Sequence, residues 1–267
     1  MTRYVVYEVQ KLSSSNKQVV AIQESLPNWA LSGFLKIDGI FGSATQQAVK
    51  TFQKESGLTA DGIVGPSTAT ALGVWTNVQK GFDASHWNSI SWSDITVDYS
   101  FCNLKATEGA TYTDPDFHDS VKKAIDVGLS VGAYHFTKFD NSPFLEAANF
   151  LDQVSGYTSM SRLYLDLEYR QSDLNAEAIH NWTMNFLNTV RGVLPLAKVG
   201  IYTSRNYMAE IGLQPFSGFE DFSLWAASWG KQPYVYPWSV WDVWQYTANG
   251  DVPWAEGDID LNLMRVE

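Results

Sequence analysis

Apolar and alternating segments recur along the chain beyond residue 79, at lengths typical of strands. Eight of them predict strands, at residues 80–84, 100–106, 130–136, 162–168, 198–203, 222–228, 240–246 and 258–264. Helical periodicity lies between several of these segments, and strands that alternate with helices favour a parallel sheet. The connections at 229–239 and 247–257 are short and contain Pro and Gly. We therefore expect an α/β fold over residues 79–267, an irregular (β/α)8-like barrel with fewer than eight helices.

Three helices of this region can be placed from their start signals. Asp114-Pro115 opens the first, Ser142-Pro143 opens the second, and Asn175 begins a third that Pro195 ends. The spacing of apolar residues predicts the buried faces of the first and third helices. These faces comprise Phe117, Val121, Ala124 and Ile125 in the first helix, and Ile179, Trp182, Phe186 and Val190 in the third.

The first quarter of the chain contains a duplicated segment. Asp38-Gly39-Ile40-Phe41-Gly42 opens one copy, and Asp61-Gly62-Ile63-Val64-Gly65 opens the other. Each copy predicts a turn that leads into a helix, because Gly permits positive φ and Asp can accept hydrogen bonds from its own turn. Pro66 suits the first turn of a helix. With an earlier run of helical spacing around Val19 and Ile22, this pattern predicts a small three-helix domain over residues 1–74.

Composition and charge exclude several classes of function. The chain is 45% hydrophobic and 18% charged, which is typical of a globular protein, and its formal net charge is −11. The acidic excess lies almost wholly beyond residue 76, so we expect no nucleic-acid partner. Cys102 is the only cysteine and no His-Glu-x-x-His spacing occurs, so we expect neither a metal site nor another cofactor. No segment has the length of a membrane span, and we expect a monomer without stable membrane insertion.

Carboxylates stand where the predicted strands end. Asp83 ends the first strand segment, Asp166 and Glu168 end the fourth, and Asp260 lies in the eighth. Barrel enzymes carry their reactive groups at the carboxyl ends of the strands. Asp166 and Glu168 would face the same side, with Cα atoms about 6.6 Å apart. Two such acids split their pKa values, and a retaining glycosidase needs one acid and one anion. An isolated Asp-x-Glu pair is also typical of a solvated strand edge.

Two sets of motifs resemble known families. The duplicated segment, with Thr45, Phe52-Gln53, Gly57-Leu58 and Thr68, resembles the peptidoglycan-binding domain type 1. The remainder resembles glycoside hydrolase family 25, the muramidases of bacteria and their phages. The motifs that carry this second resemblance are Gly81-Phe82-Asp83-Ala84-Ser85, Trp92, Lys105-Ala106-Thr107-Glu108-Gly109, Tyr112, Asp114-Pro115, Gly132-Ala133-Tyr134-His135-Phe136, Leu165-Asp166-Leu167-Glu168, Gly200-Ile201-Tyr202-Thr203, Leu224-Trp225, Trp244-Gln245-Tyr246-Thr247 and Asp258-Ile259-Asp260-Leu261-Asn262.

The family resemblance implies hydrolysis, with retention, of the β-1,4 bond between N-acetylmuramic acid and N-acetylglucosamine in bacterial peptidoglycan. Glu168 would be the acid and base, and Asp166 would stabilise a covalent or oxazolinium intermediate. Asp83 and Asp260 would line the same pocket. The aromatic residues expected to contact sugar rings are Tyr134, Tyr202, Trp225 and Tyr246.

Two further site candidates have alternative interpretations. Lys105 orients a pocket carboxylate or simply neutralises one. His135, like His86, is a wall residue of the substrate groove or a hydrogen-bonded packing residue.

The leading hypothesis is a phage-type endolysin, because the first residues lack the apolar region of a secretory signal. We expect it to be made in the host cytoplasm without a signal peptide and to reach the wall after the membrane is permeabilised. The alternatives are a chitinase-like hydrolase and a non-catalytic wall-binding or virion structural protein. Tyr164 and Ser161 stand where chitinase-like barrels commonly carry Asp, which disfavours the first alternative. A wall amidase or peptidase would need zinc ligands or a placed Cys–His pair.

Overall fold

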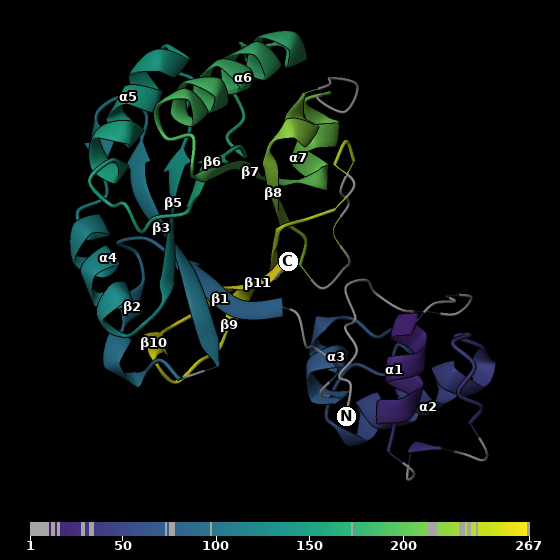
Figure 1. The fold of residues 1–267 in the computed structure, drawn as a ribbon. Coiled ribbons are helices and arrows are strands. Elements are labelled where there is room, and N and C mark those ends of the chain that lie inside the picture. Colours follow the sequence, from purple (N-terminus) through teal and green to yellow (C-terminus); the bar gives the residue numbers. More distant parts are fainter. Residues whose placement is uncertain are drawn as a thin grey trace. The chain divides into compact units, whose positions relative to one another are not determined.

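The structure is a computed structural model that describes residues 11, 14, 17–27, 30–31, 35–72, 74, 78–96, 98–171, 173–212, 218–229, 233, 236–238 and 240–265. The described residues form two compact units (Figure 1). The first contains the described residues up to Val78, and the second those from Gln79 to Arg265. Residues 1–10 and much of the 229–239 connection lie outside the described residues.

The first unit contains the three helices predicted from the sequence. They are α1 (Lys17–Ser25), α2 (Ser43–Glu55) and α3 (Pro66–Leu72). Apolar side chains at helical spacing pack into one small core, because each helix turns a single stripe inward. This core contains Val19, Ile22, Leu26, Ala30, Phe41, Ala48, Val49, Phe52, Val64, Ala69 and Val74.

A buried glutamine braces each copy of the duplicated turn. Gln23 Oε1 accepts a hydrogen bond from the Gly39 N–H at 2.9 Å, and its Nε2 donates to the Ile40 carbonyl at 3.1 Å. Gln53 repeats this pattern, accepting from the Gly62 N–H at 2.8 Å and donating to the Ile63 carbonyl at 2.8 Å. The turn glycines have φ of 74° and 75°. The sequence repeat is therefore also a structural repeat, and both turns require glycine.

Eight strands, all within the described part of the second unit, close into a barrel. The order around it is β1-β11-β9-β8-β7-β6-β5-β3, and β3 pairs again with β1. All eight strands predicted from the sequence are present. Their bounds are β1 (Val78–Ala84), β3 (Tyr99–Glu108), β5 (Ser130–Phe136), β6 (Arg162–Asp166), β7 (Lys198–Ser204), β8 (Ser223–Ala227), β9 (Val243–Gly250) and β11 (Ile259–Arg265).

The last strand runs opposite to the others, which the expectation of a parallel sheet did not include. β11 pairs with β9 antiparallel, whereas β9 pairs with β8 parallel. A direct antiparallel return needs no crossover helix, and this explains why only residues 251–258 separate β9 from β11. The predicted connection at 247–257 was therefore too long at its start, because β9 continues to Gly250. Three short strands complete the region, β4 (Tyr112–Thr113) against β3, and β2 (Ser89–Ile90) paired with β10 (Ala255–Glu256).

Helices cover the outer side of the barrel (Figure 1). They are α4 (Phe117–Asp126), α5 (Pro143–Val154), α6 (Ala176–Val193) and the unpredicted α7 (Arg205–Glu210), and single-turn 3-10 helices span 92–94 and 219–221. Ser142 and Asn175 cap α5 and α6, as their sequence signals predicted. The predicted inward face of α4 was wrong at Ile125, which is 44% exposed. Ile125 lies in the last turn of the helix, which ends at Asp126, and only Phe117, Val121 and Ala124 form its buried face.

Alternation along the strands separates an inward set of side chains from an outward one. The inward side chains form a hydrophobic core inside the barrel, which contains four aromatic residues and one valine: Phe101, Tyr164, Tyr202, Trp225 and Val243. Glycine is required where these rings crowd the wall, since a Cβ on Gly200 would lie 2.5 Å from the Ser223 carbonyl oxygen and 2.7 Å from the Tyr164 ring. Because side chains fill the barrel interior, reactive groups can meet a substrate only at the carboxyl ends of the strands.

Candidate active site

Four carboxylates meet at one end of the barrel. Asp83 lies near the end of β1, Asp166 is the last residue of β6, and Glu168 follows it by two positions. Asp260 is at the start of β11, and because β11 is antiparallel, its start lies at the end where β1 and β6 finish. Asp83 and Asp166 are each only 6% exposed, Asp260 is half-buried, and Glu168 is exposed. The cluster therefore extends from the barrel interior to solvent.

Asp83 is held by two amide side chains. Its Oδ2 accepts hydrogen bonds from Asn262 Nδ2 at 2.6 Å and from Gln245 Nε2 at 3.0 Å. These bonds favour the charged carboxylate. Burial and the nearby charge of Asp260 outweigh them and raise the pKa of Asp83 well above its usual range. Sequence reasoning missed Gln245 and Asn262 as site residues, although Asn262 shares a strand face with Asp260.

The other three acids also retain protons more strongly than free carboxylic acids do. Burial, followed by the charges of Glu168 and Asp83, raises the pKa of Asp166 well above its usual range. Partial desolvation and the charge of Asp260 raise the pKa of Glu168, and desolvation raises that of Asp260. All four acids cannot ionise together easily, because each new charge repels the others. The site can thus hold an acid and an anion near neutral pH.

Lys105 partly offsets the rise in the pKa values of two of these acids. Its positive charge lowers the pKa of both Asp166 and Glu168. The Lys105 Nζ donates to Glu108 Oε2 at 2.6 Å, and Lys138 pairs with the other oxygen of Glu108. Lys105 therefore tunes the charge of the cluster from one side, and Glu108 and Lys138 are partners that the sequence did not single out.

Three of the four predicted aromatic residues lie together beside the carboxylates. The Trp225 ring centroid is 4.7 Å from that of Tyr202 and 5.9 Å from that of Tyr134. The Trp225 Nε1 donates to Asn262 Oδ1 at 2.7 Å, and the Tyr202 hydroxyl donates to Gln245 Oε1 at 2.9 Å. Burial and the charges of the clustered acids raise the pKa values of Tyr134 and Tyr202. Trp225 is 1% exposed and Tyr134 half-buried, so Tyr134 is the more accessible ring.

Tyr246 and His135 lie apart from this group. Burial raises the pKa of Tyr246, and the neighbouring charge that adds to this effect is Tyr99 rather than an acid of the cluster. His135 is fully buried on the outward side of β5, where its Nε2 lies 2.9 Å from Glu146 Oε2 and its Nδ1 2.7 Å from Thr107 Oγ1. Its ring stacks on Phe186. This position supports the packing interpretation and gives His135 no access to a substrate.

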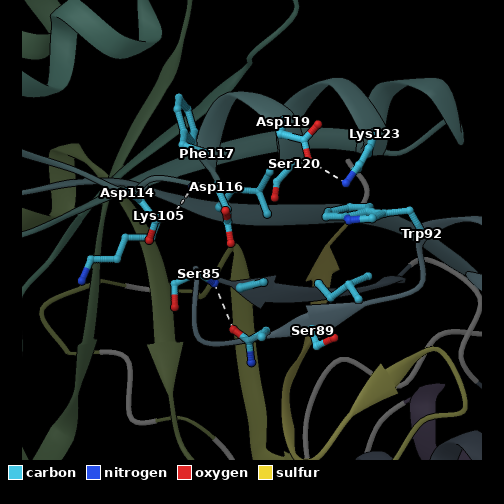
Figure 2. A pocket seen from close by; sticks show the side chains of 14 residues that line it. Ser85, Ser89, Trp92, Lys105, Asp114, Asp116, Phe117, Asp119, Ser120 and Lys123 are labelled. Atoms are coloured by element: carbon cyan, nitrogen blue, oxygen red, sulfur yellow. Dashed lines mark hydrogen bonds and ion pairs between the residues drawn. The ribbon is translucent and has the colours of Figure 1, made fainter.

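A polar pocket of about 210 Å³ lies outside the barrel wall (Figure 2). Ala84 and Leu104 line it from the outward face of β1 and β3, whereas Asp83, one position earlier, points inward. Figure 2 shows Asp119 paired with Lys123 on the α4 side and Asp114 below Phe117. None of the four clustered acids lines this pocket, although Lys105, whose charge acts on Asp166 and Glu168, is among its lining residues.

The described residues contain neither a metal-binding cluster nor a membrane-spanning helix. No group of three or more His, Cys, Asp or Glu side chains in this part of the chain is arranged to hold a metal ion. No helix among the described residues is long and apolar enough to cross a membrane.

Comparisons with known proteins match both units of the chain. The model of glycosyl hydrolases family 25 matches residues 82–254, and that of a putative peptidoglycan binding domain matches residues 15–72. Lysozyme M1 of Streptomyces globisporus is 31% identical over 221 residues, which are 74% of this chain and 71% of that protein. The autolytic lysozyme of Clostridium acetobutylicum is 27% identical over 70% of this chain and 54% of that protein. The crystal structure of the bacterial lysozyme from Streptomyces coelicolor has a TM-score of 0.60 at 29% identity, over 69% of this chain and 90% of that one.

Proposed function

Because the chain belongs to glycosyl hydrolases family 25, we propose that it is a muramidase that hydrolyses the glycan strands of bacterial peptidoglycan. The bond broken joins the anomeric carbon of N-acetylmuramic acid to the 4-oxygen of N-acetylglucosamine. The observation that carries this proposal is the group of four carboxylates at one barrel end, with a buried pair below and an exposed acid above.

Glu168 is the proposed proton donor. It is exposed, so a substrate oxygen can reach it, and its raised pKa keeps its acid form to a higher pH than an ordinary carboxyl. Its proton passes to the departing 4-oxygen as the glycosidic bond breaks. Glu168 then takes a proton from the incoming water, whose oxygen bonds to the anomeric carbon.

Asp166 and Asp83 complete the proposed mechanism. Asp166 stabilises the positive charge that develops at the anomeric carbon, through a covalent intermediate or an oxazolinium ion formed by the acetamido group, and the configuration is retained. Asp83 and Asp260 bias the charge of the pocket, because the pKa of Asp166 responds to both of them. Tyr134 is the accessible ring beside the reacting sugar, and Trp225 and Tyr202 pack behind it.

The first unit would hold the enzyme on its insoluble substrate. Support comes from the match of residues 15–72 to a putative peptidoglycan binding domain. The same combination of binding unit and hydrolase suits an endolysin that is made in the host cytoplasm and reaches the wall after membrane permeabilisation.

The Glu168→Gln variant tests the assignment of the acid. We expect it to lose at least about 100-fold in the release of reducing ends from purified wall, which is the lower bound for general acid catalysis. Glu177→Gln, an exposed glutamate in the first turn of α6, is the matched control and should keep full activity. Equal activity of Glu168→Gln and wild type would remove Glu168 from this role.

A further inference from the structure

An exposed tryptophan stands beside the candidate active site and has no role in the mechanism above. Trp87 is 82% exposed, more than any other described tryptophan. It follows Asp83 by four residues, so their Cα atoms are at most about 14 Å apart. Single exposed apolar residues are common and need no explanation. Trp87 differs because its ring is fixed by neighbours that are themselves buried or hydrogen-bonded.

The turn that carries Trp87 is closed by three hydrogen bonds. The Asn88 N–H donates to the Ser85 carbonyl at 3.0 Å, and the Ser85 N–H donates to Asn88 Oδ1 at 3.0 Å. The Trp87 N–H donates to Ser85 Oγ at 3.4 Å. Figure 2 marks the contact between Ser85 and its partner. The backbone under the indole is therefore held in one conformation.

A buried acid holds the ring on which Trp87 packs. The His86 ring lies 4.4 Å from the Trp87 ring, between centroids. His86 Nδ1 donates to Asp114 Oδ2 at 2.7 Å, and the His86 backbone N–H donates to the same oxygen at 3.1 Å. The Asp114 side chain is only 1% exposed. A charge-assisted bond to a buried carboxylate fixes the imidazole, and this imidazole supports the indole.

Tyr112 connects this group to the catalytic acids. Its ring is 6.1 Å from the His86 ring and 39% exposed. Lys105 Nζ lies 5.7 Å from the centre of the Tyr112 ring, and the charge of Lys105 acts on Asp166 and Glu168. We call the three rings of Trp87, His86 and Tyr112 the Trp87 platform. The platform extends from the candidate active site, at Tyr112, to the outer edge of the same barrel end, at Trp87.

We propose that the Trp87 platform is an outlying sugar-binding subsite, at which the exposed indole stacks on a pyranose ring of the glycan strand beyond the bond that is cut. Sugar rings have an apolar face of C–H groups, and a rigid, flat and exposed ring matches it with little loss of conformational entropy. The proposal rests on the proposed function, since the strand that occupies the platform is the one that Glu168 cleaves.

The test is a series of wall-derived glycan oligosaccharides of increasing length. We expect Trp87→Ala to lower kcat/KM by about two- to tenfold on long strands, the range of specific aromatic contacts, with a smaller loss on the shortest cleaved oligosaccharides. Trp87→Phe keeps a flat ring and should restore most of the activity. Leu196→Ala is the matched control, because Leu196 is 99% exposed and lies just before β7 begins, at the opposite barrel end.

Two kinetic results would overturn the proposal, namely no loss at any length or the same loss at every length. Calorimetry can compare the binding of intact long glycan to Glu168→Gln and to the Glu168→Gln/Trp87→Ala double variant. This comparison distinguishes failure of the subsite proposal from failure of the muramidase proposal. If the wild type cleaves no glycan, the muramidase proposal fails. Weaker binding by the double variant would then still support the platform, and equal binding would reject it.

Discussion

Replacing Asp166 with asparagine should stabilise the protein while it removes activity. Asp166 is 6% exposed, and its Oδ1 has no hydrogen-bond partner among the described residues. Burial and the charges of Glu168 and Asp83 raise its pKa in the folded state. Between its ordinary pKa of 3.8 and the raised value, the folded protein holds a proton that the unfolded chain releases. The wild type therefore loses stability as the pH rises through this window, and Asp166→Asn does not.

The size of the gain follows from replacing a buried carboxylate, whose charge burial and two neighbouring acids disfavour, with a neutral amide of the same shape. Leaving a buried group unpaired costs about 1–3 kcal/mol, and more when the group is charged, and each kcal/mol shifts the melting temperature of a domain of this size by about 2–4 °C. We expect Asp166→Asn to melt about 2–12 °C above wild type near neutral pH. The difference should shrink as the pH falls towards 3.8, and it disappears below that value, where the folded and unfolded chains both hold the proton.

The assay is thermal unfolding followed by circular dichroism across about pH 4–8, together with the release of reducing ends from purified wall. Asp251→Asn, which removes an exposed carboxylate, is the control and should leave both measurements unchanged. A lower melting temperature for Asp166→Asn at every pH would refute the reasoning, because it would show that the Asp166 carboxylate stabilises the folded state.

Three further predictions follow from other contacts. Lys105→Met removes the charge that lowers the pKa of Glu168, so the alkaline limb of the kcat profile should move to higher pH; an unmoved limb would contradict this. Gln53→Leu leaves the Gly62 N–H unpaired and removes one donor from the Ile63 carbonyl, and should destabilise the first unit by about 1–3 kcal/mol in denaturant unfolding, whereas an unchanged midpoint would show that the Gln53 hydrogen bonds are dispensable. Gly200→Ala places a Cβ 2.5 Å from a carbonyl oxygen, and should cost the barrel about 1–3 kcal/mol in the same assay; wild-type stability would mean that the wall can shift.

Periodicity carried most of the fold prediction. The eight strands and the helix caps at Ser142 and Asn175 were predicted from local sequence patterns, and the structure contains all of them. The direction of β11 has no local signal, because an antiparallel return and a parallel crossover use the same strand residues. The loop before β11 is short, and its length was the one available indication of the antiparallel return.

The site was less predictable, because contacts between distant strands decide which side chains meet. Tyr134 and His135 were both proposed to contact substrate, yet neighbours on a strand face opposite sides, and the structure turns His135 outward. The same alternation could have identified Asn262 from Asp260. Gln245 was not predictable in this way, because its role depends on the pairing of β9 with β11 across the barrel end.

The most direct test of the muramidase proposal is digestion of purified peptidoglycan in water labelled with heavy oxygen, followed by mass spectrometry of the products. Hydrolysis adds the labelled oxygen to the carbon at which the bond was broken. We predict the label at the reducing end of N-acetylmuramic acid. A label at the reducing end of N-acetylglucosamine, or in freed peptide carboxyl groups, would contradict the account.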